Sequence, residues 1–198
     1  MERKVTMMNK MVFATNNENK LREAGEILSP LGIKVISQRE AGANCDPEEN
    51  GSNFAENALI KARAVYERVK MPVFADDSGL CVDALGGRPG VYSARYAAKG
   101  QECGKLLAEM QDVPEEKRGA AFECVIAYVD GETEFTVSGR CQGSIGYEER
   151  GANGFGYDPI FICGGRTMAE MTSEEKNELS HRGAALRELY MRLEKKGE

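Results

Sequence analysis

Phe74–Arg95 reads FADDSGLCVDALGGRPGVYSAR, and the rest of the chain is best understood from this stretch. A short apolar run, Pro72–Ala75, ends in two adjacent carboxylates, Asp76 and Asp77. Acidic side chains at the end of a buried strand are costly unless they are paired or bind a metal ion. Open α/β sheets bind ligands at the carboxyl ends of their strands, where carboxylates hold Mg²⁺ or act as a general base. The alternative is an ordinary Asp-Asp-Ser-Gly turn.

Length and composition are those of an ordinary globular protein. The chain has 198 residues, of which 41% are hydrophobic and 29% charged, enough for one large domain or two closely packed lobes. No apolar run approaches the roughly 20 residues of a membrane helix, and Met1–Lys10 leads into no apolar signal-peptide core. We therefore expect a cytoplasmic protein with a single domain, residues 1–198, in which residues 1–9 form a loose tail.

The net charge of −6 argues against a sequence-independent nucleic-acid binder, which needs a basic face. A small phosphorylated ligand stays possible if local cations and a divalent metal bridge it to acidic residues. The single histidine and the absence of a Cys-x-x-Cys motif among six cysteines disfavour a zinc cluster. Cysteines in apolar runs, such as Cys124, are interpreted as core residues; a disulfide framework or a catalytic thiol is the minority alternative.

The N-terminal part predicts a strand, a polar loop and a helix. Met11–Ala14 is apolar, Thr15–Asn19 is polar, and helical periodicity begins at Lys20. Such a loop aims backbone N–H groups and the positive end of the helix dipole at an anion. Lys20 has the wrong sign for that dipole unless it has an anionic partner. The alternative is that Asn17 or Asn19 caps the helix and Lys20 is merely exposed.

The next segment predicts a strand over Lys34–Ser37 and a helix from Ser52 or Asn53 to about Lys70. Glu49 belongs to the acidic loop between them, and such loops are usually just solvated. Lys61 falls near the apolar face of the helix. It either extends along that face to solvent or is directed at a buried anion.

The second half of the chain predicts a helix, a hairpin, a glycine-rich loop and two more helices. The predicted elements are a helix at Gln101–Gln111, strands at Ala120–Val129 and Glu134–Gly139, a strand at Ile160–Cys163, a short helix from Thr172 and a last helix at His181–Lys195. Phe155 and Tyr157 in the glycine loop suit stacking on a base or, alternatively, packing on the core. His181 and Arg182 oppose the dipole of the last helix unless that end binds an anion or a carbonyl.

The element order indicates mixed α/β architecture around one long sheet. The residues that follow predicted strands or begin helices are the ones that a metal and nucleoside triphosphate site requires. They are Lys20, Glu49, Asp77, Phe155, Lys176 and Arg182. Cations neutralise phosphate, carboxylates hold the metal and activate water, and an aromatic ring stacks on the base.

Five motifs spanning nearly the whole chain resemble those of the inosine triphosphate pyrophosphatase family, which hydrolyses non-canonical purine nucleotides. They are Thr15-x-Asn17-x-x-Lys20, Ala75–Leu80, Leu85–Tyr96, Gly154–Phe161 and Ser180–Leu186. The resemblance implies Mg²⁺-dependent hydrolysis of ITP, dITP and XTP to the monophosphate and pyrophosphate. It also implies a homodimer and a two-lobed α/β fold, ITPase-like (Maf/Ham-like), in which helices flank a long central mixed β-sheet and the site lies between the lobes.

The resemblance also implies a role for each motif residue. At the metal it implies Glu49 as a ligand and Asp77 as both metal-associated acid and general base. The residues implied at the phosphates are Thr15, Asn16, Asn17, Lys20, Lys61, Ser78 and Lys176, and Glu18 and Asn19 are implied as further substrate-binding residues. The residues implied around the base are Phe155, Gly156, Tyr157 and Asp158, with His181 and Arg182 reading the 6-oxo group of the purine.

Two other functions stay open. A pyrophosphatase of the septum-formation-inhibitor type would act on dTTP, UTP or modified pyrimidines, and the Ser180-His181-Arg182 signature argues against it. A nucleotide-binding module without turnover is the second alternative, and the presence of Glu49 and Asp77 argues against that one.

Overall fold

The computed structural model describes residues 10–197, so the expected N-terminal tail, residues 1–9, lies outside the described residues. Among the described residues the strands form one seven-stranded sheet in the order β2-β1-β3-β4-β5-β6-β7. β1 (Lys10–Phe13) pairs in parallel with β2 (Lys34–Ser37) and β3 (Val73–Val82). The other end is antiparallel, with β6 (Phe161–Cys163) between β5 (Glu134–Ile145) and β7 (Arg166–Thr167). The sheet is therefore mixed, as the sequence predicts.

The chain divides into two compact units, and three long strands contribute residues to both. The first unit comprises the described residues of Met1–Asp77, Val125–Gly139 and Gly183–Glu198, and the second comprises Ser78–Cys124 and Arg140–Arg182. The strands that both units share are β3, β5 and β4 (Gly119–Val129). The unit boundary in β3 falls between Asp77 and Ser78, so these two neighbouring predicted site residues belong to different units.

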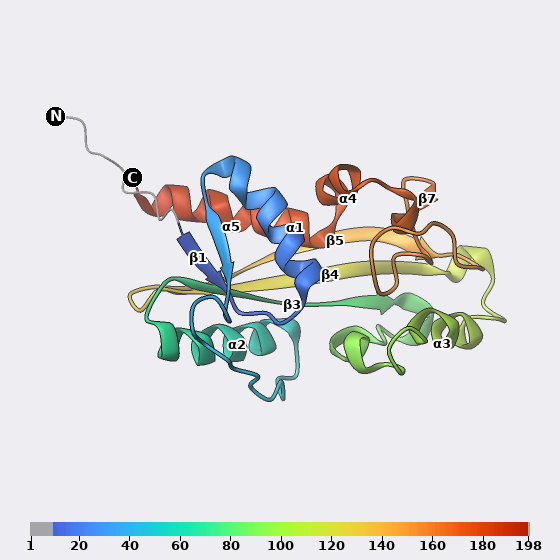
Figure 1. The fold of residues 1–198 in the computed structure, drawn as a ribbon. Coiled ribbons are helices and arrows are strands. Elements are labelled where there is room, and N and C mark those ends of the chain that lie inside the picture. The colour runs from blue at the N-terminus through green and yellow to red at the C-terminus, as the bar shows by residue number, and fades with distance from the viewer. Residues whose placement is uncertain (1–9, 198) are drawn as a thin grey trace. The chain divides into compact units, whose positions relative to one another are not determined.

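In the first unit, helices cover both faces of the strands. Figure 1 shows α1 (Glu18–Leu28) and α5 (His181–Gly197) on one face and α2 (Phe54–Val69) on the other. Ala58, Ala62 and Val65 of α2 are buried, as the helical periodicity predicts. The core that includes these α2 residues is made of small and branched side chains. They are Val12, Ala14, Ile36, Ala43, Cys45, Ala58, Ala62, Val65, Val73, Ala75, Ala127 and Val129.

The second unit has its own core, richer in large side chains. α3 (Glu102–Glu109) contributes Leu106, and the loop after β5 contributes Tyr157 and Ile160. Five short 3₁₀ helices occur in the described chain, at Ser29–Leu31, Asp83–Leu85, Gly90–Arg95, Glu115–Lys117 and Met168–Glu170. α4 (Ser173–Leu179) begins with a capping box, in which Thr172 and Glu175 satisfy each other's backbone N–H groups.

One prediction at the centre of the chain is wrong. The strand does not end at Ala75, because β3 continues without interruption through Asp76, Asp77, Ser78 and Gly79 to Val82. The continuation depends on a contact far along the chain, since the hydroxyl oxygen of Ser93 accepts a hydrogen bond from the N–H of Leu80 at 2.9 Å. A side chain at position 79 would collide with the carbonyl oxygen of Gly90, so only glycine lets the 90–95 segment lie against the strand. The Asp-Asp-Ser-Gly turn is therefore excluded.

Candidate active site

The first carboxylate of β3 provides the anionic partner that Lys20 needs. Asp76 is buried, and its Oδ1 lies 3.0 Å from the Nζ of Lys20. Asn17 is the N-cap of α1, since its side-chain oxygen accepts the N–H groups of Asn19 and Lys20. The lysine therefore stands in the first turn of a capped helix, and the buried carboxylate offsets its unfavourable position at the positive end of the dipole.

The second carboxylate is the centre of a denser cluster. The Nζ of Lys61 donates a hydrogen bond to Oε2 of Glu49 at 2.9 Å and lies 3.6 Å from Oδ1 of Asp77. The side-chain amide of Asn57 donates to the other oxygen, Oδ2 of Asp77, at 3.0 Å. Lys61 is thus directed at one buried and one half-buried carboxylate rather than along the helix to solvent, and Glu49 is paired rather than merely solvated.

Asp76 and Asp77 meet different helices because consecutive strand residues point to opposite faces of a sheet. Lys20 comes from α1 and Lys61 from α2, and these helices cover opposite faces of the first unit (Figure 1). Both carboxylates lie beyond the last residue of β1, since Phe13 pairs with Phe74. The two carboxylates therefore lie at the carboxyl end of the parallel strand β1 in the first unit, although β3 itself runs on.

Burial and charge set the protonation of this cluster. Burial raises the pKa of Asp77; Lys61 and the hydrogen bond from Asn57 oppose that shift, and the neighbouring Glu49 charge adds to it. For Lys61, burial lowers the pKa, but the negative charges of Asp76, Asp77 and Glu49 outweigh it, so the pKa is raised. A carboxylate with a raised pKa beside a firmly charged ammonium suits a general base that works near neutral pH.

The donor set at this cluster fits Mg²⁺. Among residues 10–197 there is no group of three or more His, Cys, Asp or Glu side chains that could hold a metal ion. The described residues therefore show no site in which such side chains alone would surround a metal ion. Mg²⁺ instead keeps several waters and is typically held by one or two carboxylates together with substrate phosphates. Glu49 and Asp77, drawn toward one ammonium, provide such a pair.

The loop before α1 is open and polar. Asn16, Asn17 and Glu18 are exposed, whereas Thr15 and Asn19 are half-buried. The Thr15 hydroxyl accepts the N–H of Asn17 at 3.1 Å, and this contact shapes the turn. The predicted phosphate loop therefore exists as a short, capped turn in the first unit.

In the second unit, three predicted site residues form one cluster, in which Asp158 and Lys176 are buried and Phe155 is half-buried. The Nζ of Lys176 lies 2.7 Å from Oδ2 of Asp158 and 4.6 Å from the centre of the Phe155 ring. Oδ2 of Asp158 also accepts the N–H of Phe155 at 2.7 Å, which fixes the glycine-rich loop. Lys176 therefore lies with the residues predicted for the base.

The start of α5 adds two more residues to this unit's group. Arg182 is buried and donates a hydrogen bond to the hydroxyl of Ser78 at 3.0 Å, and its guanidinium carbon lies 5.8 Å from the centre of the Phe155 ring. The imidazole of His181 is buried and stacks on Phe122, with ring centres 4.7 Å apart. Neither residue is simply exposed, so that alternative is excluded. Binding of an anion or a carbonyl at this helix start stays a prediction.

The two aromatics of the glycine loop differ. The Tyr157 side chain packs in the core of the second unit and its hydroxyl donates to the carbonyl of Ser93 at 2.9 Å. The alternative of core packing therefore describes Tyr157. Phe155 is half-buried beneath two cationic groups, and Gly156 is exposed.

Comparison with known proteins shows which family the chain belongs to. A sequence profile of the Ham1 family matches residues 11–192. The chain belongs to the Ham1 family. Its solved relatives include a HAM1 protein from Coxiella burnetii, with 43% identity, a TM-score of 0.84, and coverage of 95% of this chain and 100% of that one. The Ham1 protein of Staphylococcus aureus has 38% identity and a TM-score of 0.83, covering 94% and 99%.

Curated relatives carry the name dITP/XTP pyrophosphatase. The protein of Yersinia pseudotuberculosis serotype I (strain IP32953) is 50% identical over 189 residues, 91% of this chain and 95% of that protein. The protein of Bacillus subtilis (strain 168) is 48% identical over 195 residues, 95% and 98% of the two chains. Membership of the Ham1 family thus agrees with the resemblance drawn from the motifs.

Sequence reasoning missed two residues that shape the site of this Ham1-family chain. Asp76 was not assigned a role, although strand alternation and the unexplained charge of Lys20 together point to it. Asn57 gave no signal, because an asparagine one turn after a helix start is ordinary in sequence. Its importance comes only from its contacts with Asp77 and with the N–H of Gly51.

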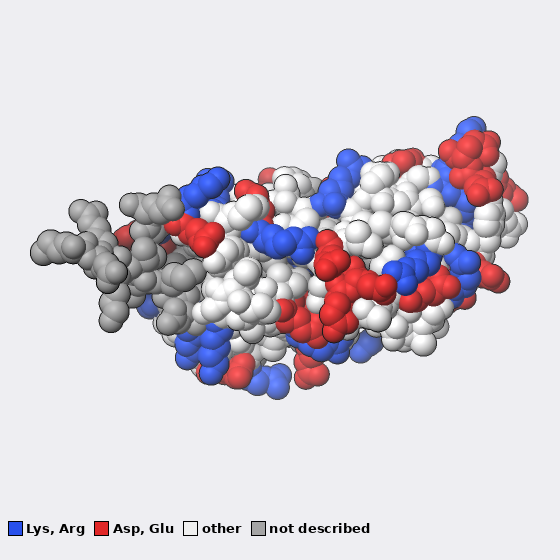
Figure 2. All heavy atoms as spheres, turned by 90° about the horizontal axis from the view of Figure 1, so that it is seen from above, with Lys and Arg blue, Asp and Glu red and all other residues white. Residues whose placement is uncertain are grey.

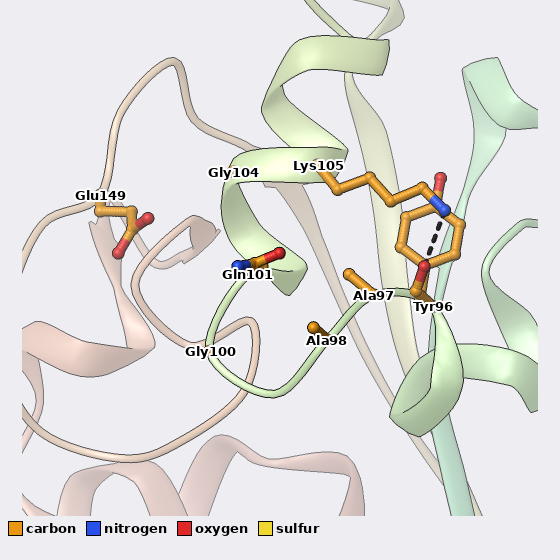
Figure 3. A pocket seen from close by; sticks show the side chains of 8 residues that line it. All are labelled: Tyr96, Ala97, Ala98, Gly100, Gln101, Gly104, Lys105 and Glu149. Atoms are coloured by element: carbon orange, nitrogen blue, oxygen red, sulfur yellow. Dashed lines mark hydrogen bonds between the residues drawn. The ribbon is translucent and has the colours of Figure 1, made fainter.

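The second unit also has a separate hollow of about 660 Å³. None of the residues that line it belongs to the clusters described above. Its walls come from Tyr96, Ala97, Ala98, Gly100, Gln101, Gly104, Lys105 and Glu149 (Figure 3). The Nζ of Lys105 donates to the carbonyl of Tyr96 at 2.7 Å and lies 4.2 Å from the centre of its ring. That lysine is therefore held by another residue of the same wall.

Proposed function

We propose that this protein is a nucleoside triphosphate pyrophosphatase that hydrolyses non-canonical purine nucleotides, ITP, dITP and XTP, to the monophosphate and pyrophosphate. The observation that carries the proposal is the Glu49–Lys61–Asp77 cluster, in which a buried carboxylate with a raised pKa lies beside a second carboxylate and a charged ammonium. The names of the curated relatives support it. The face of the molecule in Figure 2 carries interspersed acidic and basic side chains, which suits a small ligand better than a nucleic acid.

In this reaction Asp77 acts as the general base. Its carboxylate takes a proton from a water molecule, whose oxygen attacks the α-phosphorus while the bond from that phosphorus to the bridging oxygen breaks. Pyrophosphate leaves and the nucleoside monophosphate remains. Mg²⁺, held by Glu49 and Asp77, would supply charge neutralisation on the phosphates and a template for their orientation.

Phosphate binding belongs to the first unit. Lys61 keeps its proton, as its raised pKa indicates, and so offers a permanent positive charge. Lys20 offers a second ammonium at the start of α1, where the backbone N–H groups and the helix dipole also favour an anion. The Thr15–Asn19 loop adds polar side chains around the same helix start.

Base recognition belongs to the second unit. A purine with a carbonyl at C6 offers an acceptor, whereas adenine offers an amino donor, and Arg182 can only donate. An adenine base would leave such a buried donor unsatisfied, at a cost of about 1–3 kcal/mol, or a factor of about ten to a hundred. Phe155 supplies a ring for stacking. The contacts of Lys176 favour a place at the base rather than at the phosphates, which refines the role expected from the motifs.

Three further expectations belong to this proposal. The metal is Mg²⁺, the chain works as a homodimer, and it is located in the cytoplasm. Among the described residues, no helix combines the length and the apolar character needed to cross a bilayer.

The test is a product assay. Purified protein and Mg²⁺ are incubated with ITP, XTP, dITP, GTP, ATP and dTTP, and monophosphate, diphosphate, pyrophosphate and orthophosphate are resolved. We expect monophosphate and pyrophosphate from ITP, dITP and XTP, with little from ATP or GTP. Diphosphate and orthophosphate would place the attack at the γ-phosphorus. A preference for dTTP would favour the septum-formation-inhibitor type, and no turnover of any nucleotide would favour a binding module.

A further inference from the structure

One buried amide in the first unit contacts both Asp77 and the loop that carries Glu49. Asn57 is 1% exposed and makes a hydrogen bond at each end of its side chain. Its Nδ2 donates to Oδ2 of Asp77 at 3.0 Å, and its Oδ1 accepts the backbone N–H of Gly51 at 2.8 Å. Gly51 follows Glu49 by two residues in the irregular segment before α2. The same side chain therefore holds Asp77 and the loop that carries Glu49.

The orientation of this amide is determined by its partners. The N–H of Gly51 can only donate, so the atom that faces it must be the amide oxygen. Asp77, when ionised, can only accept, so the atom that faces it must be the amide nitrogen. A reversed amide would break both hydrogen bonds inside a buried site, where an unsatisfied polar group costs about 1–3 kcal/mol. The side chain thus has one satisfactory arrangement.

With the amide in this orientation, the two carboxylate oxygens of Asp77 have different partners. Asn57 occupies Oδ2, and Lys61, one helical turn later on α2, faces Oδ1 at 3.6 Å. The carboxylate is therefore fixed in rotation about its last bond by two side chains of the same helix face. The loop end fits closely too, since a Cβ on Gly51 would come within 2.7 Å of the amide oxygen of Asn57.

Asn57 is not needed to cap its helix. The N-cap of α2 is Asn53, whose side-chain oxygen accepts the N–H of Glu56 at 2.9 Å. An asparagine in a helix interior is unfavourable relative to alanine, so its presence there calls for contacts made by the side chain. One contact of this amide leads to Asp77, which is expected at the metal, and the other leads to Gly51, two residues after Glu49.

We propose that Asn57 is the positioning residue that sets the Asp77 carboxylate and the Glu49 loop in the geometry for holding the divalent metal and activating water. This inference rests on the proposed function, because it concerns the same two carboxylates. Residues that orient metal ligands typically change metal affinity or activity by about 10- to 100-fold when they are removed.

The test compares Asn57→Ala with Asn53→Ala as a matched control. Both variants shorten an asparagine near the start of α2, but only the first loses the contacts with Asp77 and Gly51. Binding of Mn²⁺ to the free protein is measured by isothermal titration, without nucleotide. Steady-state hydrolysis of ITP at saturating Mg²⁺ gives kcat and KM, and thermal melting shows how much protein is folded.

For Asn57→Ala we expect Mn²⁺ binding about 10-fold weaker and kcat about 10- to 100-fold lower, with KM for ITP within about threefold of wild type. Asn53→Ala should melt at a lower temperature, yet bind Mn²⁺ and turn over ITP as wild type does. Gly51→Ala is a second variant, which crowds the amide oxygen of Asn57 and the Cβ of Glu56 without touching Asp77, and it should also weaken Mn²⁺ binding. If Asn57→Ala does not fold, the Mn²⁺ affinity of Gly51→Ala tests the inference instead.

Wild-type Mn²⁺ affinity and kcat in Asn57→Ala would overturn the inference, as would losses no larger than those of Asn53→Ala. If Asn57→Ala is unfolded, wild-type Mn²⁺ affinity in Gly51→Ala overturns it. The two proposals fail in different ways. A wild-type protein that releases no monophosphate and pyrophosphate from ITP contradicts the proposed function, whereas the Mn²⁺ comparison needs no nucleotide and still decides whether Asn57 positions the carboxylates.

Discussion

The Nζ of Lys176 lies 2.7 Å from Oδ2 of Asp158, and both side chains are more than nine-tenths buried. Removing one partner of such a pair leaves the other charge buried without compensation, which typically costs about 3–5 kcal/mol. We predict that Asp158→Asn lowers the melting temperature by about 10 °C, at roughly 2–4 °C per kcal/mol for a chain of this size. Because asparagine has nearly the size of aspartate, the fall in melting temperature measures the effect of removing the negative charge.

The control for this prediction is Glu175→Gln, which breaks the half-exposed pair of Glu175 with Arg166 in the same unit. Exposed pairs contribute about 0–1 kcal/mol, so that variant should melt close to wild type. Asp158→Asn and Glu175→Gln with equal melting temperatures would show that the buried pair is not a main support of the glycine-rich loop.

Asp77→Asn is predicted to abolish hydrolysis while the fold is retained. Burial raises the pKa of Asp77, so the folded protein binds a proton more readily than the unfolded chain. Stability from this group is therefore fully present below the ordinary pKa and is lost as the pH rises through the raised value. In EDTA, the asparagine variant should melt higher than wild type at pH 7, and the difference should vanish near pH 3.

Melting curves from pH 3 to pH 8 check this sign, with Asp83→Asn, an exposed acid in the 3₁₀ helix after β3, as the control. The same raised pKa predicts that kcat/KM of wild type falls on the acid side at a pH above the usual aspartate range. Turnover by Asp77→Asn near the wild-type rate would remove Asp77 as the base.

Arg182→Met is predicted to reduce discrimination between purines. The guanidinium donates to Ser78 and lies near the Phe155 ring, so its loss removes a donor from the group expected at the base. We expect kcat/KM for ITP to fall about 10- to 100-fold while that for ATP changes little, since one buried hydrogen bond is at stake. Arg166→Met, which removes a more exposed arginine of the same unit, should leave the ITP-to-ATP ratio unchanged.

Local patterns predicted much of this fold because their signals lie within a few residues. Asn53 capping α2, the capping box at Thr172 and the buried stripe of α2 all follow from spacing alone. Lys20 and Lys61 pointed to nearby acidic side chains for the same reason. A cation at the start of α1 or beside the apolar face of α2 is unfavourable without an anion, and the structure places Asp76, Asp77 and Glu49 at them.

The features that the sequence alone does not show have the opposite origin. Whether β3 stops at Ala75 or continues depends on Ser93, thirteen residues from the N–H of Leu80 that it binds, and Asp and Gly have low strand propensity. The core position of Tyr157 depends on the carbonyl of Ser93, 64 residues away. Asn57 is defined by a contact 20 residues along the chain. Such partners are set by tertiary packing, which one sequence without its fold does not display.

Arg118 supports the second unit through one fully buried guanidinium. It is 2% exposed and donates to the carbonyl oxygens of Met110, Val113, Ile145 and Gly146, at distances from 2.6 to 3.1 Å. The guanidinium carbon lies 4.1 Å from the centre of the Tyr147 ring, so the exposed aromatic shields it. Because no aliphatic side chain can donate to these carbonyls, we predict that Arg118→Met destabilises the protein by about 3 kcal/mol or more.

Urea unfolding followed by circular dichroism measures this loss, and kcat for ITP in the folded fraction should stay near wild type because Arg118 touches no predicted site residue. Arg118→Lys should recover only part of the stability, since an ammonium lacks the planar fork that reaches several carbonyls at once. Arg140→Met breaks only an exposed pair with Glu123 and should unfold at nearly the wild-type urea concentration. If Arg118→Met unfolds at the same concentration as Arg140→Met, the buried guanidinium is not what holds these four carbonyls in place.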